Sequence, residues 1–217
     1  MKRTYTYLIF TIISFFSISA SSTDSVSTFY KDGAFVSQYQ RKIKVSNKIV
    51  SAVTSDLVSD FHTTPGNLFN WALKDLGLQG HKDNELIIVL KSSINDPKTN
   101  VTHGLFDVVL PGLTSFNNIK MDGIIQKTNY ANGQTKVTAD IIYSSFVIKN
   151  ALGTLTIIPL SNNEQLYISN LKIEFDWFFN LFITKRRYKT IVEWRIKKFT
   201  ENMIDESEKR QKAVKSK

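Results

Sequence analysis

Side chains that could perform acid–base or metal chemistry are few in this sequence, and their spacing favours no common site. The three histidines are His62, His81 and His103, and none lies four residues from another. Two ligands at that helical spacing are the usual sign of a zinc site on a helix. Cysteine is absent, which excludes disulfide and zinc–thiolate chemistry. The sequence therefore predicts no metal site and no cofactor.

Two groups of acidic residues could in principle exchange protons. Asp56 and Asp60 precede His62 at the end of a predicted helix, and Glu174 and Asp176 lie on one face of a predicted strand. Two carboxylates on one face can do acid–base work, but a solvated surface is the simpler interpretation of both groups. The sequence has no Gly-rich phosphate loop and no Gly-x-Ser-x-Gly motif. Enzymatic activity is left open, and a non-enzymatic role is favoured.

The N-terminus has the order of residues that is typical of a secretory signal peptide. Lys2 and Arg3 precede an apolar run over 7–18, and small residues follow over 19–22. The run is shorter than the roughly 20 residues that a membrane-spanning helix needs. We therefore predict a signal peptide over 1–21 and an exported protein, periplasmic or extracellular. Export without any cysteine favours a protein of the bacterial envelope.

The positive charge of the chain is concentrated at its C-terminal end. The whole sequence has a net charge of +9, and residues 185–217 contain twelve basic and five acidic residues. This basic segment begins with Lys185, Arg186 and Arg187. It is either a solvated helix or a surface that contacts an anionic membrane or a glycan. Nucleic acid is not expected as a partner, because residues 22–184 carry no basic excess.

Turn residues and apolar spacing predict the elements of the N-terminal half. Residues 22–33 are rich in Ser, Thr and Asp and are predicted to be a linker. A strand is predicted over 35–45, where alternate residues are apolar. Apolar residues at four-residue spacing predict a helix over 47–61, which Pro65 follows closely. A second, unusually apolar helix is predicted over 67–76.

The period then changes from helical to strand-like. Six strands are predicted over 85–91, 102–110, 119–130, 134–148, 154–160 and 166–183. Asn132-Gly133 lies between two of them and is a strong hairpin signal. A helix over 187–209 and a charged tail over 210–217 complete the chain. The predicted fold is α+β, with a seven-stranded antiparallel sheet (strand-helix-helix-six strands) gripping a long C-terminal helix, in a single domain over 34–209.

This element order resembles that of the START-like helix-grip superfamily, which includes polyketide cyclases and lipid-transfer domains. The resemblance covers roughly 34–205 and depends on the order of elements, above all on the last strand running into the last helix. It implies an apolar cavity between the concave sheet and the C-terminal helix. Plant members carry a glycine-rich loop after the second strand, and residues 92–100 of this chain contain no glycine at that place.

The resemblance implies which side chains would line such a cavity. The predicted wall comprises the last strand's Ile173, Phe175, Trp177 and Phe179, the helix's Val192, Ile196, Phe199 and Met203, and the central Ile141 and Tyr143. Tyr143 is the candidate for orienting a ligand, because a buried hydroxyl needs a partner. The same residues could instead fill a solid core.

Two functions follow from these interpretations. The first is an exported, non-enzymatic protein that binds a lipid-like or other apolar small molecule in the cavity. The alternative is an envelope interaction protein with a filled core, whose basic C-terminal helix contacts an anionic membrane or a glycan. A hydrolase or cyclase of the same fold would need polar groups that converge inside the cavity.

Overall fold

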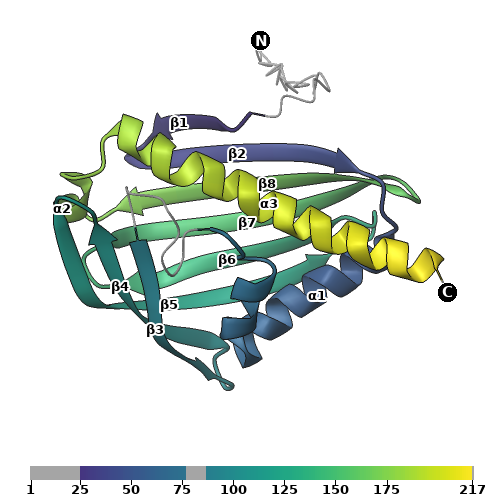
Figure 1. Ribbon diagram of the computed structural model, residues 1–217, viewed down its shortest axis with the longest axis horizontal. Helices are drawn as coiled ribbons and strands as arrows, with labels where there is room; N and C mark the ends of the chain where they lie inside the picture. Colours follow the sequence, from purple (N-terminus) through teal and green to yellow (C-terminus); the bar gives the residue numbers. More distant parts are fainter. Residues whose placement is uncertain (1–24, 77–86, 217) are drawn as a thin grey trace, which may run out of the picture.

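A computed structural model describes residues 25–76 and 87–216 of the chain. In this part, eight antiparallel strands form one sheet around a long helix (Figure 1). The strands are β1 (Ser27–Lys31), β2 (Ala34–Ile43), β3 (Ile87–Asp96), β4 (Val101–Leu110), β5 (Thr114–Asn129), β6 (Thr135–Ser144), β7 (Ile148–Ser161) and β8 (Glu164–Phe175). The helices are α1 (Asn47–Thr63), the 3-10 helix η1 (Pro65–Asn70), α2 (Trp177–Asn180) and α3 (Lys185–Lys215). The predicted α+β architecture is confirmed, with one strand more than expected.

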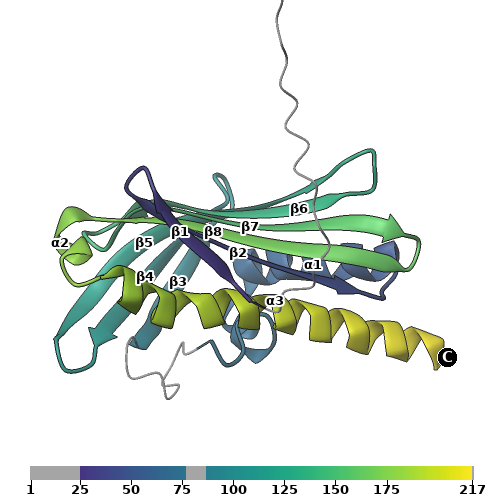
Figure 2. The same cartoon turned by 90° about the horizontal axis from the view of Figure 1, so that it is seen from above.

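The sheet order is β1-β2-β8-β7-β6-β5-β4-β3. Strands β3 to β8 thus form a meander, and β2 returns beside β8. The predicted hairpin at Asn132-Gly133 joins β5 to β6, with Gly133 at a φ of 81°. Figure 2 shows the sheet curving over α3 and α1, which both lie on its concave side.

The extra strand, β1, lies inside the segment predicted to be a linker. Asp32 and Gly33 connect it to β2, and both have positive φ angles, 52° and 79°. This is the type I′ geometry that two-residue hairpins prefer, and Asp-Gly is one of its usual sequences. The prediction of a linker is therefore wrong for 27–33, because it was based on the Ser- and Thr-rich composition and did not take account of the Asp-Gly hairpin signal.

The second predicted helix is wrong in its type and extent. Residues 65–70 form a single 3-10 segment, and the chain then turns, with a φ of 59° at Asp75. A positive φ at a residue other than glycine cannot continue an α-helix. The C-terminal cap expected at Gly77 lies outside the described residues.

The last strand is shorter than its alternating sequence predicts. It ends at Phe175, and Asp176 caps a new helical turn by accepting a hydrogen bond from the Phe178 amide at 3.3 Å. Asp is a favoured N-cap residue. Trp177 and Phe179, which were expected to continue the alternation of the strand, therefore lie on a helical turn instead. Trp177 consequently faces solvent, and Phe179 is buried.

Helix α3 is longer than predicted at both ends. It begins after Thr184, whose hydroxyl accepts a hydrogen bond from the Arg187 amide at 3.2 Å, and continues to Lys215. Residues 210–215 of the expected charged tail are therefore helical, and the side chain at their start has partners. Arg210 pairs with Asp56 on α1 and with Glu206 on its own helix. None of the helices in the described ranges is long and apolar enough to cross a membrane.

Two apolar clusters occupy the concave side of the sheet. The first contains Val53 and Leu57 of α1 with Met203 of α3. The second contains Phe35 of β2 and Tyr188 of α3, whose rings are stacked at 4.0 Å. Helix α3 covers both clusters. Any space between these clusters and the sheet is therefore bounded by α3 on one side.

Candidate functional site

A cavity of about 350 Å³ lies beside the first apolar cluster. Side chains of α1, η1, α3 and strands β5 to β8 surround it, and it is partly open to solvent. Its position between the concave sheet and the C-terminal helix is the one that the sequence analysis expected. The core therefore contains a hollow beside the first cluster.

A single row of paired residues across four strands forms the middle of the cavity floor. Ile125 pairs with Ala139, Ala139 with Gly153, and Gly153 with Leu171. All four line the cavity. The two central positions carry an alanine and a glycine, which are the two smallest residues, so the cavity is deepest above them.

Neither local backbone strain nor crowding explains why position 153 is a glycine. Its φ angle is not in the left-handed region, and a Cβ atom there would lie 3.8 to 4.0 Å from Ala139 and Leu171. Those are ordinary van der Waals separations, so a small side chain would fit. The effect of the glycine is to widen the hollow above it.

Apolar side chains of the helices form the opposite wall. Leu57 and Phe61 come from α1, Leu68 comes from η1, and Ile196 and Phe199 come from α3. The four-residue spacing that predicted α1 places Leu57 and Phe61 on the same face. Leu73 and Leu76, from the turn that follows η1, complete the lining at its edge.

The turn over 71–76 is attached to α3 by side-chain donors. Asn202 is buried, and its amide nitrogen donates to the carbonyl oxygens of Ala72 and Lys74 at 3.1 and 2.7 Å. Arg195 donates from Nε to the carbonyl of Leu76 at 2.8 Å. These bonds fix the part of the wall that has no regular secondary structure.

The same turn is also attached to α1. The carboxylate of Asp60 accepts hydrogen bonds from the indole nitrogen of Trp71 at 2.9 Å and from the side chain of Asn67 at 2.8 Å. The Asp56, Asp60 and His62 group, considered as an acid–base candidate, is thus structural in part. His62 contacts Asn95 of β3 at 3.1 Å, away from the cavity lining.

One polar side chain of the floor, Ser169, is hydrogen-bonded to Thr200 of α3. The hydroxyl groups of Ser169 and Thr200 lie 2.7 Å apart, and that of Thr200 lies 2.8 Å from the Ile196 carbonyl oxygen. A threonine hydroxyl has one hydrogen, so Thr200 donates either to Ser169 or to the Ile196 carbonyl oxygen at any moment. Arg195 brings a positive charge to the lining, and its guanidinium lies 4.5 Å from the centre of the Trp194 ring.

Two buried tyrosines anchor α3 on either side of the cavity. The Tyr167 hydroxyl lies 3.0 Å from that of Ser207, and the Tyr188 hydroxyl lies 3.2 Å from that of Ser37. Burial raises the pKa of Tyr167 to about 12, and the hydrogen bond to Ser207 opposes this shift. Burial likewise raises the pKa of Tyr188 to about 12, against the hydrogen bond to Ser37. Both phenols are neutral at physiological pH.

Lys127 attaches α1 to the sheet next to the cavity. Its ammonium group donates to the carbonyl oxygen of Ser51 and to the hydroxyl of Ser55, both at 2.8 Å. Partial burial lowers the pKa of this lysine, and the negative charge of Asp56 opposes the shift. Within the described part of the chain, no group of three potential metal ligands is present.

The structure divides the predicted site residues among several places. Ile196 and Phe199 line the cavity. Met203 belongs to the first apolar cluster, while Phe179 and Val192 belong to the second, against which Ile173 and Phe175 pack. These last four residues fill the core beside the cavity instead of lining it.

Two predicted wall residues are in the wrong place. Trp177 is 75% exposed on α2, for the reason given above. Tyr143 is 51% exposed, so it is not the buried hydroxyl that was expected. The pairing of β5 with β6 shifts by one residue between Asp122 and Gly123, and such a bulge interrupts the alternation on which the prediction relied. Ile141 lies just before this bulge, is partly buried, and is not part of the cavity lining.

Sequence reasoning missed the residues that make the hollow. Ala139, Gly153 and Ser169 are small, and a search for large apolar side chains passes over them. The available signal was the presence of Ala139 and Gly153 at inward positions of neighbouring strands, where large residues are the rule.

Comparisons with known proteins find likeness at the level of structure. No protein-family model and no curated protein matches the sequence. The Zhui aromatase/cyclase from Streptomyces has a TM-score of 0.51 at 7% identity, with 82% of this chain and 95% of that chain covered. A START superfamily protein from Mycobacterium smegmatis has a TM-score of 0.42 at 12% identity, with 82% and 98% covered. Norcoclaurine synthase from Thalictrum flavum, in complex with dopamine and hydroxybenzaldehyde, has a TM-score of 0.40 at 13% identity, with 83% and 90% covered.

The meander, the C-terminal helix on its concave side and the cavity between them define a helix-grip protein. The chain thus has the START-like fold that its element order predicted, and the recognition from sequence is confirmed at that level. Proteins of this fold often bind apolar ligands in the cavity between sheet and helix. Identities this low establish the fold and leave the ligand to be argued from the lining itself.

Proposed function

We propose that this protein binds an apolar small molecule in the cavity between β5–β8 and α3. The observation that carries the proposal is the floor row in which Ala139 and Gly153 occupy the two central positions. A protein stabilised by burial alone gains from large apolar residues at such positions. A small pair there leaves a hollow in the middle of an otherwise well-packed sheet.

The size and chemistry of the cavity suit a lipid-like ligand. Its volume of about 350 Å³ is at the lower end of the range for small-molecule sites. Twelve of the seventeen lining residues have aliphatic or aromatic side chains, so water inside would find few hydrogen-bond partners. Transfer of an apolar ligand into this space is favourable for the same reason.

The lining supports binding more than catalysis. Ser169 and Thr200 satisfy each other, and the charged side chain among the described lining residues is that of Arg195. Acid–base catalysis needs an ionisable group within hydrogen-bond reach of the reacting atom. Arg195 remains protonated and suits the polar end of an amphipathic ligand better than a proton transfer.

The order of residues in the N-terminal segment supports export as the setting for this function. The signal peptide predicted over 1–21 lies outside the described residues. We propose that the protein is exported to the periplasm or the cell exterior and there binds a lipid-like molecule without changing it chemically. N-terminal sequencing of the protein isolated from its host tests this part, because removal of residues 1–21 is expected.

Filling the floor of the cavity tests the binding proposal. The probe is N-phenylnaphthylamine, an uncharged dye whose fluorescence rises in apolar surroundings. Ala139→Leu adds three carbons inside the cavity and is expected to weaken dye binding about tenfold or more, since the ligand and the new side chain compete for one space. The wild-type protein should bind the dye with one saturable site.

The matched control is Thr138→Leu on the same strand. Successive side chains of a strand point to opposite faces, so this leucine lies outside the cavity. Binding as in the wild type is expected for Thr138→Leu. Equal dye binding by wild type and Ala139→Leu, with both folded by circular dichroism, would contradict the proposal.

A further inference from the structure

A cluster of exposed apolar side chains protrudes at the α2 end of the molecule. Trp177 is 75% exposed and Leu181 is 69% exposed, and Phe178 and Phe146 are also exposed. We call these four residues the aromatic tip. Large apolar side chains that gather on one surface mark a place of contact with another molecule or a membrane.

The aromatic tip stands on a firm base. The ring of Phe116 on β5 packs against three other rings. Its centre lies 5.6 Å from the centre of the Phe146 ring, 6.4 Å from that of Phe178 and 5.4 Å from that of Phe179. Phe179 is buried in the second apolar cluster. The exposed residues are therefore held in position on the folded domain and do not belong to a loose end of the chain.

Positive charge accompanies the aromatic tip. Lys185 and Arg186 follow at the start of α3, and both are exposed. Within the described residues, neither forms an ion pair, whereas nearby Glu174 is paired with Lys149 at 2.7 Å. Asp176 is engaged in capping α2. With Lys149, Lys185 and Arg186 set against Glu174 and Asp176, three positive charges face two negative ones, and the balance beside the tip is positive.

We propose that the aromatic tip docks the protein onto the surface of an anionic lipid bilayer. Trp side chains favour the boundary between lipid headgroups and hydrocarbon, and Phe and Leu favour the hydrocarbon beneath it. Lys185 and Arg186 are placed to contact anionic headgroups at the same time. An anionic glycan would contact the two cations and could stack a sugar ring on Trp177, but it offers no apolar phase in which Leu181 and the Phe rings would be buried.

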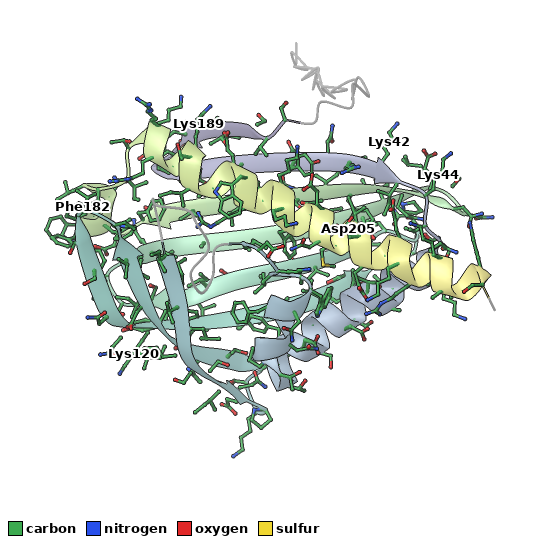
Figure 3. The ribbon with its side chains drawn as sticks, in the orientation of Figure 1. Lys42, Lys44, Lys120, Phe182, Lys189 and Asp205 are labelled. Carbon is green, nitrogen blue, oxygen red and sulfur yellow. The ribbon has the colours of Figure 1, made fainter. Side chains whose placement is uncertain are left out.

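This docking surface is separate from the cavity. The second apolar cluster lies at the tip end of the core, and the cavity lies beside the first cluster. Figure 3 shows Phe182 at the tip end of the molecule and Lys42 and Lys44 at the far end. The proposal is therefore independent of whether the cavity holds a ligand.

A dye placed on the tip tests the proposal directly. The chain contains no cysteine, so Leu181→Cys gives one site for an environment-sensitive NBD label. The control is Val214→Cys, which is 62% exposed on α3 at the C-terminal end, opposite α2 (Figure 1). Both variants keep the same N-terminus, so any contribution of the apolar run over 7–18 to vesicle binding is equal in both.

The labelled proteins are mixed with vesicles of phosphatidylcholine or of phosphatidylcholine with phosphatidylglycerol. At position 181 we expect a blue shift and a rise in emission with the anionic vesicles, and no comparable change at position 214. Adding Lys185→Gln and Arg186→Gln should weaken this response about tenfold at low salt. Trp177→Ser should also weaken it, since it removes the largest exposed ring.

Two outcomes would overturn the proposal. The first is a position-181 label that does not respond to anionic vesicles, or responds no more than the label at position 214. The second is a response that heparin, a soluble anionic glycan, produces equally well at position 181. The second result would assign the basic residues to a glycan instead of a membrane.

Discussion

At the scale of single residues, Ala139 and Gly153 have the largest effect on the space inside this protein. Each lies at the middle of the sheet, and each is paired with the other across β6 and β7. The surrounding floor positions carry Ile125, Leu171 and Leu155. Two small side chains among large ones create the hollow, and Ser169 and Thr200 close its polar edge by bonding to each other.

The buried tyrosines predict a loss of stability in alkaline solution. The pKa of Tyr167 rises from 10.0 to about 12 on folding, and that of Tyr188 does the same. Between pH 10 and 12 the folded protein therefore binds more protons than the unfolded chain. The contribution of the two tyrosines to the free energy of unfolding is fully present below pH 10 and is lost as the pH rises towards 12. Each tyrosine accounts for a loss of up to about 2–3 kcal/mol.

Urea unfolding at several pH values checks this prediction. Tyr167→Phe should flatten the decline in the free energy of unfolding between pH 10 and 12, and Ser207 keeps a partner because it also donates to the Met203 carbonyl at 2.7 Å. Tyr143→Phe, on the exposed surface, is the control and should decline as the wild type does. A Tyr167→Phe slope equal to that of the wild type would show that this phenol does not titrate differently in the two states.

At the scale of elements, the wall of the cavity depends on a segment without regular structure. The turn over 71–76 is held between α1 and α3 by the side chains of Asp60, Asn202 and Arg195. Its own backbone bonds are local, such as that from the Leu73 amide to the Leu68 carbonyl. Such a segment opens more easily than a strand or a long helix.

Asn202→Ala is expected to loosen this wall. The change leaves the Ala72 and Lys74 carbonyls without their side-chain donor, at a cost of about 1–3 kcal/mol. Amide hydrogen exchange over 71–76 should become faster while β7 and β8 remain protected. Lys198→Ala removes an exposed ion pair of 3.9 Å to Asp75 in the same turn and should have little effect. Unchanged exchange over 71–76 in Asn202→Ala would mean that α3 does not hold this turn.

The elements that the sequence predicts well are those with a long, regular period. The spacing from Ile49 to Leu57 identified α1, and the stripe from Val192 to Met203 identified the buried face of α3. The errors lie where a capping or turn residue overrides the period. Asp176 ends β8 before Trp177, and Asp32-Gly33 adds a strand to the edge of the sheet. The end of α3 depends on Arg210 contacting Asp56, a long-range pair that no local pattern reveals.

At the scale of the whole molecule, the aromatic tip and the cavity lie in different parts of the fold. The end with α2 has the second apolar cluster and the aromatic tip, and the region of α1 and η1 contains the cavity. Element order was enough to predict the fold and the approximate place of the cavity. Its lining was predicted only for Ile196 and Phe199, because the identity of lining residues depends on strand register and on a bulge in the β5–β6 pair.

The central claim is that the cavity holds an apolar molecule, and native mass spectrometry of the protein isolated from its host tests it most directly. The wild-type protein should carry an additional component of fixed mass that organic extraction removes. Ala139→Leu, isolated in the same way, should carry less of it or none, while Thr138→Leu should carry as much as the wild type. A wild-type protein that is found only at its calculated mass, and that also fails to take up N-phenylnaphthylamine, would contradict the claim.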